Sequence, residues 1–408
     1  QAAPEVSLDK YSVMMTEEAP VLTVKNEAKE NGAVTYTSSD INVATIDNNG
    51  KITLVGAGEV TFTVTFAETN NYNANSATTN KLVVSLDTLT KDNFIVNEKA
   101  TYDGSDKKAE ATADVEGIGT ITTIYKKDGE VVTEAINAGS YDIYVTVTEG
   151  KDYAAITEEL YVGTLVIAKA DQAAPEVSLD KYSVMMTEEA PVLIVENEAK
   201  ENGAVTYTSS DAKVATIDNN GKITLVGAGE VTFTVTFAET NNYNANSATT
   251  NKLTVTRDTL TADAFIVKDT EATYDTTAKA ATVTEDVEGM GEITVTYKQG
   301  ETVVASPTDA GEYDIYVTVT QGTKYEAIAD LKVGTLTIKK ANQAAPEVSL
   351  DKYSVMMTEE APVLIVENEA KENGAVTYTS SDAKVATIDN NGKITLVGAG
   401  EVTFTVTF

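Results

Sequence analysis

The sequence predicts an all-β protein made of tandem β-sandwich domains that together form an extended rod. A long internal repeat divides the chain into modules of roughly 85 residues, a size that suits a small β-sandwich. Within every module, short runs alternate apolar residues with Thr, which is the period-two pattern of half-buried strands. No apolar run approaches the ~18–20 residues that a membrane-spanning helix requires.

The repeat begins with the stretch QAAPEVSLDKYSVMMTEEAP, which starts at Gln1, Gln172 and Gln343, a spacing of 171 residues both times. A period of this length is too long for one solenoid turn and matches two small domains. Residues 172–237 and 343–408 are identical. Residues 1–66 differ from them at four positions, where Thr23 corresponds to Ile194, Lys25 to Glu196, Ile41 to Ala212 and Asn42 to Lys213.

Each repeat contains two unlike modules, which we call A and B. The A modules are predicted at residues 1–86, 172–257 and 343–408, and the last of these lacks the predicted final strand. The B modules are predicted at residues 87–171 and 258–342, and they share the stretches DTLT, DVEG and YDIYVTVT. The linkers between them are short and contain one Pro, so we expect limited hinge motion. The alternation also keeps identical modules apart, which we expect to hinder misassembly.

The strands of the A module follow from its local patterns. The stretch GEVTFTVTF, residues 58–66, predicts one long half-buried strand whose inward face carries Val60, Phe62, Val64 and Phe66. The stretch VATIDNNGKITLV, residues 43–55, predicts a hairpin around Asn-Gly, which is the strongest short hairpin signal. Further strands are predicted at residues 33–40 and 80–85. Residues 27–30 are the best candidate for a short helix, although a loop fits them better.

The B module also reads as a series of strands. Residues 121–136 predict a hairpin that turns at Asp128-Gly129, and residues 141–148 and 163–169 predict two further strands. Tyr141 alternates with apolar residues, so we expect it to pack inside the sandwich in the manner of a tyrosine corner.

The stretch VTYTSSD, together with VATIDNNGKITLVGAGEVTFTVT, resembles the core pattern of bacterial immunoglobulin-like group 2 domains. The B module is similar to MBG-type domains of bacterial surface proteins through TYDG, AGSYDIYVTVTEGKDY and GTLVIAKA. The second B module departs from this pattern at Thr276, which replaces Gly104. These resemblances cover nearly the whole chain and imply tandem immunoglobulin-like sandwiches from large bacterial surface proteins. They imply no catalytic residues.

Composition restricts the function further. The formal net charge is -33 and is spread along the chain, which disfavours nucleic acid as a partner. The chain has no Cys and no His, and therefore lacks a disulfide framework, a thiol nucleophile and the commonest general base. Some of the 63 acidic residues must lie close together by chance, but no insertion that would form a cleft interrupts the strands. We therefore expect no enzymatic activity.

Two sets of residues are candidates for binding. The carboxylates of Asp87, Asp92, Asp258 and Asp263 lie near module boundaries, where calcium would stiffen a rod. Residues 47–50 resemble part of a calcium loop, but the ligand spacing fails and a hairpin turn explains them better. Tyr72, Tyr153 and Tyr325 lie in predicted loops, where they either stack on sugar rings or pack over the ends of the sandwiches. No other cofactor is expected.

The sequence thus predicts an extracellular stalk or fibre segment of a repetitive, adhesin-like protein of the bacterial cell surface. One alternative is a module that binds a host glycan or protein through its loops. A second is a filament subunit whose third A module is completed by a strand from another chain. The simpler explanation for the missing strand is that the sequence is an excerpt of a longer array. A third is a phage surface protein. The expected partners are neighbouring domains or further copies of the chain, and the ligand is not specified by any stretch.

Overall fold

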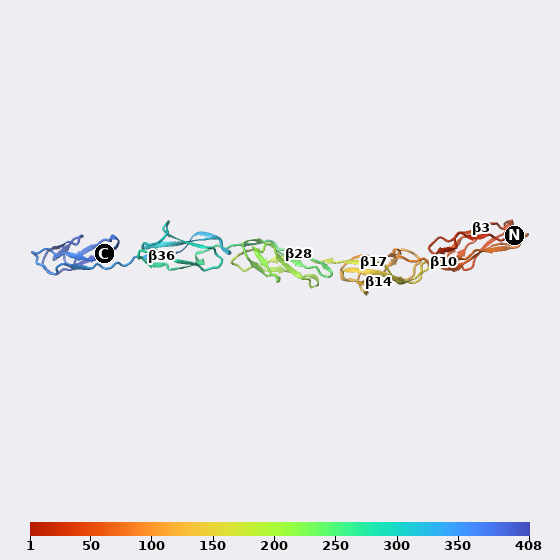
Figure 1. The fold of residues 1–408 in the computed structure, drawn as a ribbon, viewed down its shortest axis with the longest axis horizontal. Helices are drawn as coiled ribbons and strands as arrows, with labels where there is room; N and C mark the ends of the chain where they lie inside the picture. The colour runs from red at the N-terminus through yellow and green to blue at the C-terminus, as the bar shows by residue number, and fades with distance from the viewer.

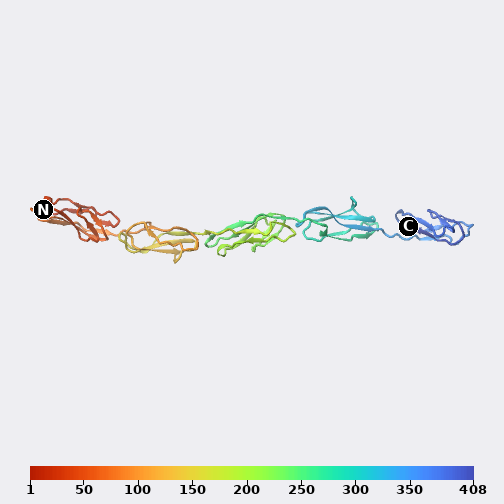
Figure 2. The ribbon, with the colours of Figure 1, turned by 180° about the vertical axis from the view of Figure 1, so that it is seen from behind.

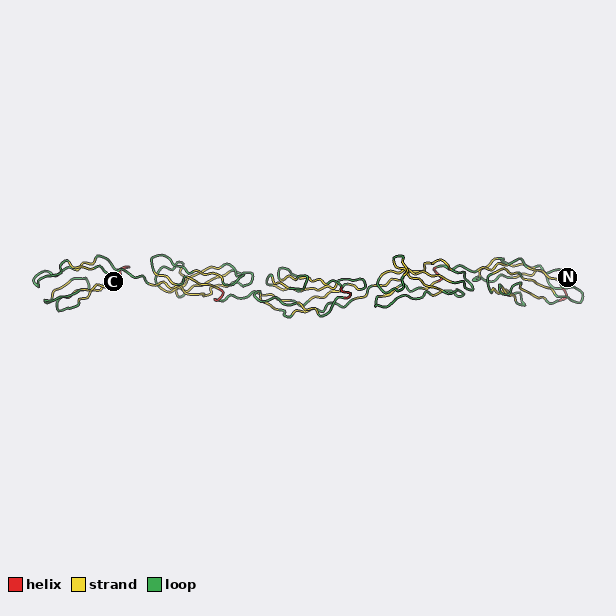
Figure 3. Tube along the Cα trace, turned by 90° about the horizontal axis from the view of Figure 1, so that it is seen from below, coloured by secondary structure: helices red, strands yellow, loops and turns green.

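The computed structural model describes residues 1–408 as a rod of five β-rich segments that follow one another in chain order (Figure 1). The view from behind shows the N-terminus at one tip, whereas the C-terminus lies back from the opposite tip, within the third A module (Figure 2). A perpendicular view shows the same extended shape, with short helical turns and otherwise strands and loops (Figure 3). None of the helices has the length and apolar character needed to cross a membrane.

The strands of the first A–B repeat are short in the A module and longer in the B module. The first A module contains β1 (Val6–Leu8), β2 (Ser12–Met14), β3 (Leu22–Val24), β4 (Val34–Ser38), β5 (Ala44–Ile46), β6 (Ile52–Leu54), β7 (Gly58–Val60), β8 (Phe62–Phe66), β9 (Asn75–Thr78), β10 (Leu82–Ser85) and the 3-10 turn η1 (Lys29–Asn31). The first B module contains η2 (Lys91–Asn93), β11 (Phe94–Ile95), β12 (Lys99–Thr101), β13 (Thr112–Ala113), β14 (Ile121–Lys127), β15 (Glu130–Val131), β16 (Gly139–Val147), β17 (Ile156–Ala168) and β18 (Ala170–Asp171).

The second repeat reproduces this pattern. The second A module contains β19 (Val177–Leu179), β20 (Ser183–Met185), β21 (Leu193–Val195), η3 (Lys200–Asn202), β22 (Val205–Ser209), β23 (Ala215–Ile217), β24 (Ile223–Leu225), β25 (Gly229–Val231), β26 (Phe233–Phe237), β27 (Tyr243–Asn244), β28 (Asn246–Thr249) and β29 (Leu253–Thr256). The second B module contains η4 (Ala262–Ala264), β30 (Phe265–Lys268), β31 (Glu271–Thr273), β32 (Thr282–Glu285), β33 (Ile293–Gln299), β34 (Thr302–Val304), β35 (Gly311–Val319) and β36 (Ile328–Lys339). The third A module contains β37 (Val348–Leu350), β38 (Leu364–Val366), η5 (Lys371–Asn373), β39 (Thr377–Ser380), β40 (Ala386–Ile388), β41 (Ile394–Leu396) and β42 (Phe404–Thr407).

The A module is a sandwich of small sheets. One sheet has the strand order β2-β10-β7 and another the order β4-β8-β9, while β1 pairs with β3 and β5 pairs with β6. Alternate residues of β7 and β8 face the core between them: Val60, Phe62, Val64 and Phe66 are all at most 1% exposed. The predicted alternation is therefore confirmed, and it places these side chains between the layers.

The prediction of one long strand at residues 58–66 is wrong in one respect. The chain changes sheets at Thr61, because β7 pairs with β10 whereas β8 pairs with β4 and β9. The hairpin predicted around Asn-Gly is confirmed as β5 and β6, and Gly50 takes a left-handed φ of 79° at its turn. This conformation suits glycine, which has no Cβ to clash with the backbone.

The B module has one five-stranded sheet of order β12-β17-β16-β14-β15, accompanied by the pair β11-β13. The predicted turn at Asp128-Gly129 is confirmed, with positive φ at both residues, as a hairpin of primed type requires. Tyr141 is buried, and its hydroxyl donates to the Asn137 carbonyl oxygen at 2.8 Å. This contact to a backbone group a few residues upstream is the predicted tyrosine-corner arrangement.

Each A–B repeat has separate hydrophobic cores in its A and B modules. In the first repeat, one cluster of buried residues lies within residues 8–84 and another within residues 94–167. The second repeat has corresponding clusters, within residues 179–255 and, as two adjoining groups, within residues 260–338. We therefore expect the complete modules to unfold as separate units.

The third A module has the counterparts of residues 172–237 but not those of residues 238–257, so it lacks β28 as well as the predicted final strand, β29. Residues 354–356 correspond to β20, yet they form no strand, because β20 pairs only with β29. Tyr353 is 80% exposed, whereas its counterpart Tyr182 is 37% exposed. An open groove of about 900 Å³ results, lined by side chains that include Leu350, Met357 and Phe404.

Candidate functional site

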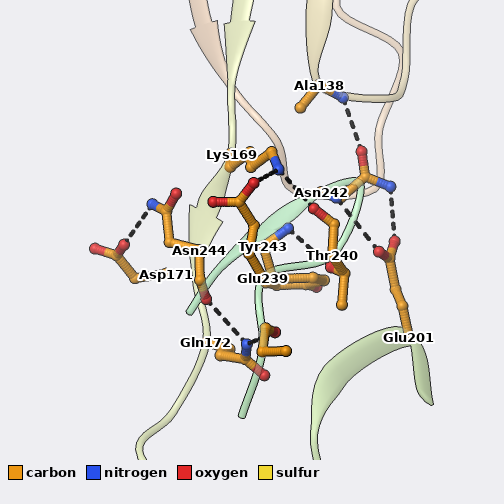
Figure 4. A network of polar contacts seen from close by, with 11 residues as sticks. Ala138, Lys169, Asp171, Gln172, Glu201, Glu239, Thr240, Asn242, Tyr243 and Asn244 are labelled. Carbon is orange, nitrogen blue, oxygen red and sulfur yellow. Dashed lines mark hydrogen bonds and ion pairs between the residues drawn. The ribbon is translucent and has the colours of Figure 1, made fainter. Parts of the chain in front are cut away.

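Polar contacts between modules concentrate where the first B module meets the second A module (Figure 4). Three kinds of interaction meet there: a buried amide network, a short parallel strand pairing, and an ion pair beside two tyrosine rings. We call this region the B–A junction. It is the candidate functional site, because it restricts how these two modules are oriented; between the second B module and the third A module the corresponding contact is a hydrogen bond from the Tyr274 hydroxyl to Glu372.

Asn242 is the centre of the B–A junction. Its side-chain Nδ2 donates to Glu201 Oε1 at 2.6 Å and to Asn137 Oδ1 at 3.0 Å. Its Oδ1 accepts from the backbone N–H of Ala138 at 2.8 Å. The residue is only 4% exposed, so a buried amide with both donors and one acceptor satisfied links the two modules.

A two-residue strand pairing joins the backbones of the two modules across their boundary. Strand β18 of the B module pairs in parallel with β27 of the A module, with Ala170 opposite Tyr243 and Asp171 opposite Asn244. The backbone N–H of Ala170 also donates to the Asn242 carbonyl oxygen at 2.9 Å. Since main-chain pairing fixes both distance and direction, it restricts rotation between the modules.

Charged and aromatic contacts flank this pairing. Lys169 Nζ donates to Glu239 Oε1 at 2.6 Å and to the Thr240 carbonyl oxygen at 2.7 Å. The rings of Tyr102 and Tyr243 meet edge to face, with centroids 5.4 Å apart. Such an aromatic pair stabilises by about 0.5–1.5 kcal/mol beyond the area that it buries. Desolvation by burial is the main cause of the raised pKa of the Tyr102 hydroxyl.

Gln172, the first residue of the second A module, is hydrogen-bonded to the loop of residues 238–244 in the same module. Its Nε2 donates to the carbonyl oxygens of Ala238 at 3.1 Å and Asn244 at 2.9 Å, and its Oε1 accepts from the backbone N–H of Lys200. Gln172 is 3% exposed. The linker is therefore held against the loop that contacts the B module, which agrees with the limited hinge motion expected from its length.

The junction from an A module to the next B module is simpler. Asp87 Oδ2 accepts from the Thr16 hydroxyl at 2.5 Å, and Asp87 Oδ1 accepts from the backbone N–H of Thr88 at 2.7 Å. Asp258 repeats this arrangement with Thr187 at 2.8 Å. The structure thus places two of the four candidate calcium ligands at module boundaries and gives each a hydroxyl partner from the preceding A module.

The other two candidate calcium ligands lie apart from these contacts. Asp92 and Asp263 are exposed residues of the short turns η2 and η4. Nowhere does the structure gather three or more acidic side chains into a group that could hold a metal ion. Calcium binding at Asp87, Asp92, Asp258 and Asp263 remains a prediction.

The three candidate ligand tyrosines have different surroundings. Tyr153 is 8% exposed and forms a bridge with Asp87, and Tyr325 is half-buried and forms the same bridge with Asp258. Both therefore lie beside an A–B boundary, and sugar binding by Tyr153 and Tyr325 stays a prediction. Tyr72 is 39% exposed at the N-terminal tip, but its counterpart Tyr243 packs on Tyr102. Sugar binding by Tyr72 remains a prediction.

Sequence reasoning missed Asn242, Glu201 and Gln172, because Asn, Glu and Gln in loops read as solvated residues. The available signal was that all three recur with identical neighbours, as Asn71, Glu30 and Gln1. Even without a module against it, Asn71 donates to Glu30 at 2.5 Å. The A module therefore carries the junction geometry on its own tip.

We expect acid to loosen the B–A junction. Hydrogen bonds, chiefly from Asn242, lower the pKa of Glu201 below its ordinary value of 4.5. Glu30 has the same lowered pKa in the first A module, where no B module lies against it, so this carboxylate stabilises the folded loop that docks rather than docking itself. That stabilisation is present above pH 4.5 and is lost as the pH falls through the lowered pKa, which loosens the loop and with it the junction. Spin labels at Glu158→Cys and Asn219→Cys should give a narrow distance distribution at pH 7 and a broader one at pH 3.

The variant Glu201→Gln is the control for this acid response. It removes the titrating group, so the distance distribution across the B–A junction should change less between pH 7 and pH 3. An equally large change in Glu201→Gln would assign the acid response to other carboxylates. The absence of native Cys makes both labels site-specific.

Two family models match the chain. The model described as MBG domain matches residues 95–171 and 264–342, and the model described as intimin, immunoglobulin-like domain matches residues 21–68, 196–239 and 367–408. The first set falls in the B modules and the second in the A modules. The predicted immunoglobulin-like and MBG-type character is thus confirmed. The immunoglobulin-like model that matches is the one described for intimin, whereas the sequence pattern resembled group 2 domains. No curated protein matches the chain.

Solved structures of low similarity include the following three proteins. They are surface layer protein SbsC, domains 1–6 (14% identity, TM-score 0.22, covering 100% of this chain and 63% of that one), Drosophila N-cadherin EC1–3 (14%, 0.19, 57% and 92%) and the Escherichia coli adhesin FdeC (12%, 0.19, 75% and 97%). The chain thus spans less than two thirds of the SbsC structure. These TM-scores are too low to compare the arrangement of whole rods.

Proposed function

The chain is a tandem array of intimin-type immunoglobulin-like domains, its A modules, and MBG domains, its B modules, and from this premise we propose that it is a stalk segment of an adhesin-like protein on the bacterial cell surface. In this role it holds a distal part of the protein away from the cell and catalyses no reaction. Among the structures of low similarity, FdeC is named as an Escherichia coli adhesin and SbsC as a surface layer protein.

The observation that carries this proposal is the B–A junction. A spacer must keep its length, so successive domains must not fold back on one another. The network around Asn242 and the pairing of β18 with β27 oppose such folding, because both would be broken by rotation between the modules. The net charge of -33 adds repulsion between distant parts of the rod at low salt.

A height measurement tests this function. The chain is tethered to a supported bilayer by its C-terminal end, and a fluorophore at Gln1 reports its distance from the membrane. Five modules of ~35–40 Å predict a height of roughly 150–200 Å. Deletion of residues 258–408 removes the second B module and the third A module and leaves the B–A junction intact. The height should then fall by about two-fifths.

An unchanged height after this deletion would contradict the spacer function. So would a fluorophore that lies close to the membrane in the full chain. Saturable binding to a glycan, lost in Tyr72→Ala, would instead support the binding-module alternative.

A further inference from the structure

The A and B modules differ in topology, yet both pair an early strand in parallel with the last strand of the module's own sheets, since β18 pairs only with the next module. In the first A module, β2 pairs in parallel with β10, and in the first B module β12 pairs in parallel with β17. The second repeat has the same pairings, β20 with β29 and β31 with β36. Two unrelated sheet orders therefore converge on one arrangement of the strands through which the chain enters and leaves.

The direction of these strands decides how they respond to tension. When a rod is pulled at its ends, the early strand of a module is drawn toward its own N-terminal end and the last strand toward its own C-terminal end. In a parallel pair these two directions are opposite, so the strands are pulled past each other. All the hydrogen bonds between them then carry the load together, whereas a hairpin pulled at its open end loses its bonds one at a time.

Backbone hydrogen bonds bracket each parallel pair at both ends. In the first A module, Val83 N–H donates to the Tyr11 carbonyl oxygen at 3.0 Å, and Met15 N–H donates to the Ser85 carbonyl oxygen at 2.9 Å. The corresponding pairs in the other three complete modules measure 2.8–3.0 Å: Val166 to Glu98 and Tyr102 to Ala168, Thr254 to Tyr182 and Met186 to Thr256, and Thr337 to Thr270 and Tyr274 to Lys339.

Buried side chains anchor the same strands to the core. Val13 of β2 and Val84 of β10 are each 2% exposed, and Ile167 of β17 is also 2% exposed. Sliding one strand along the other would drag these side chains out of their packing, which interiors at close-packed density resist. Hydrogen bonds and core packing thus oppose the same motion.

We propose that each complete A and B module is a load-bearing unit, in which the parallel pairing of an early strand with the last strand resists tension along the rod. This inference rests on the proposed stalk function, since it concerns how the stalk responds when its two ends are pulled apart. The load is mechanical tension applied through residues at both ends of a module. Strands β1 and β11 lie outside the clamped pairs and peel away first, because they pair only with β3 and β13.

The chain contains its own matched control. Residues 343–408 are identical to residues 172–237, but the third A module has no parallel pair, because no strand corresponds to β29 there. Under the proposal it yields at a much lower force than the second A module. The third A module also lacks the counterparts of β28 and of the buried side chains of β29, so this difference in force is the upper limit of what the parallel pair contributes, and the two handle geometries below separate its share.

Single-molecule pulling between handles at the two ends of the full chain tests the proposal. We expect four unfolding events at high force, each releasing roughly 70 residues, or about 20–25 nm of extended chain. The third A module should release its chain earlier, at low force. Five events of equal force, or events no stronger than that of the third A module, would overturn the proposal.

A second attachment geometry tests the direction of loading without altering the clamp. Handles at Lys10→Cys and Lys81→Cys lie before β2 and before β10, at the same end of the parallel pair, so pulling there opens it like a zipper. The unfolding force of the first A module should drop severalfold relative to end-to-end pulling. Equal forces in both geometries would overturn the proposal, even if the rod length itself agrees with the stalk function.

A substitution pair completes the test. Val83→Pro removes the N–H that donates to Tyr11, whereas Ile52→Val trims the core at β6, outside the parallel pair. End-to-end force should fall for Val83→Pro and stay near the wild-type value for Ile52→Val. If Val83→Pro leaves the module unfolded, the comparison of the two handle geometries in the unaltered clamp remains decisive.

Discussion

Replacing Phe233 by Ala lowers the free energy of unfolding of the second A module by about 3–5 kcal/mol, enough to unfold a domain of this size. Phe233 is 0% exposed and packs in the core cluster between the two sheets. Removal of its ring leaves a cavity that the surrounding strands cannot fill. The measurement is hydrogen exchange of the peptide that contains the substitution, which its mass distinguishes from the identical stretch in the third A module.

The matched variant is Phe404→Ala in the third A module. Phe404 occupies the same sequence position, but it is only half-buried because the groove beside it is open. Its loss should therefore destabilise the third A module by less than half as much. Equal effects at Phe233 and Phe404 would mean that the last strand contributes nothing to the core of the A module.

Extending the chain after Phe408 by the sequence of residues 238–257 will convert the third A module into a complete sandwich. In the second A module this segment provides β28 and β29, and Leu253 and Val255 of β29 are at most 2% exposed. Burying two such side chains stabilises by about 3–6 kcal/mol. Met357, now 49% exposed, should become buried like its counterpart Met186, which is 8% exposed.

Calorimetry of the extended chain is the measurement. We expect one additional cooperative unfolding transition, at a higher temperature than any unfolding transition of the third A module without the extension. The control is the same extension with Asp at the positions of Leu253 and Val255, which supplies the backbone without the apolar side chains. A transition unchanged by the first extension, or equally raised by the control, would contradict this account of the groove.

The sequence was sufficient for the local features of the fold. The alternation from Val60 to Phe66 identified the inward face, and Asp128-Gly129 identified a turn, because both depend on residues close together in the chain. The change of sheets at Thr61 was not visible, since the inward and outward alternation continues unbroken through it. Only the pairing partners differ, and those lie far away in sequence.

The B–A junction and the parallel strand pairs could not be predicted from local sequence patterns, for the same physical reason. The burial of Asn242 depends on Asn137 and Ala138 of the preceding module, which are more than 100 residues away. Likewise, β2 meets its partner β10 only once the rest of the module has folded. Patterns of period two reveal which side chains are inward but not which strand lies beside them.

Small-angle scattering of the monomeric chain tests the central claim most directly. A rod of five end-to-end modules, roughly 150–200 Å long, predicts a radius of gyration of about 50 Å. A compact particle of the same number of residues would give about 22 Å. A value near 50 Å with the cross-section of a single sandwich would support the stalk, and a value near 22 Å would contradict it.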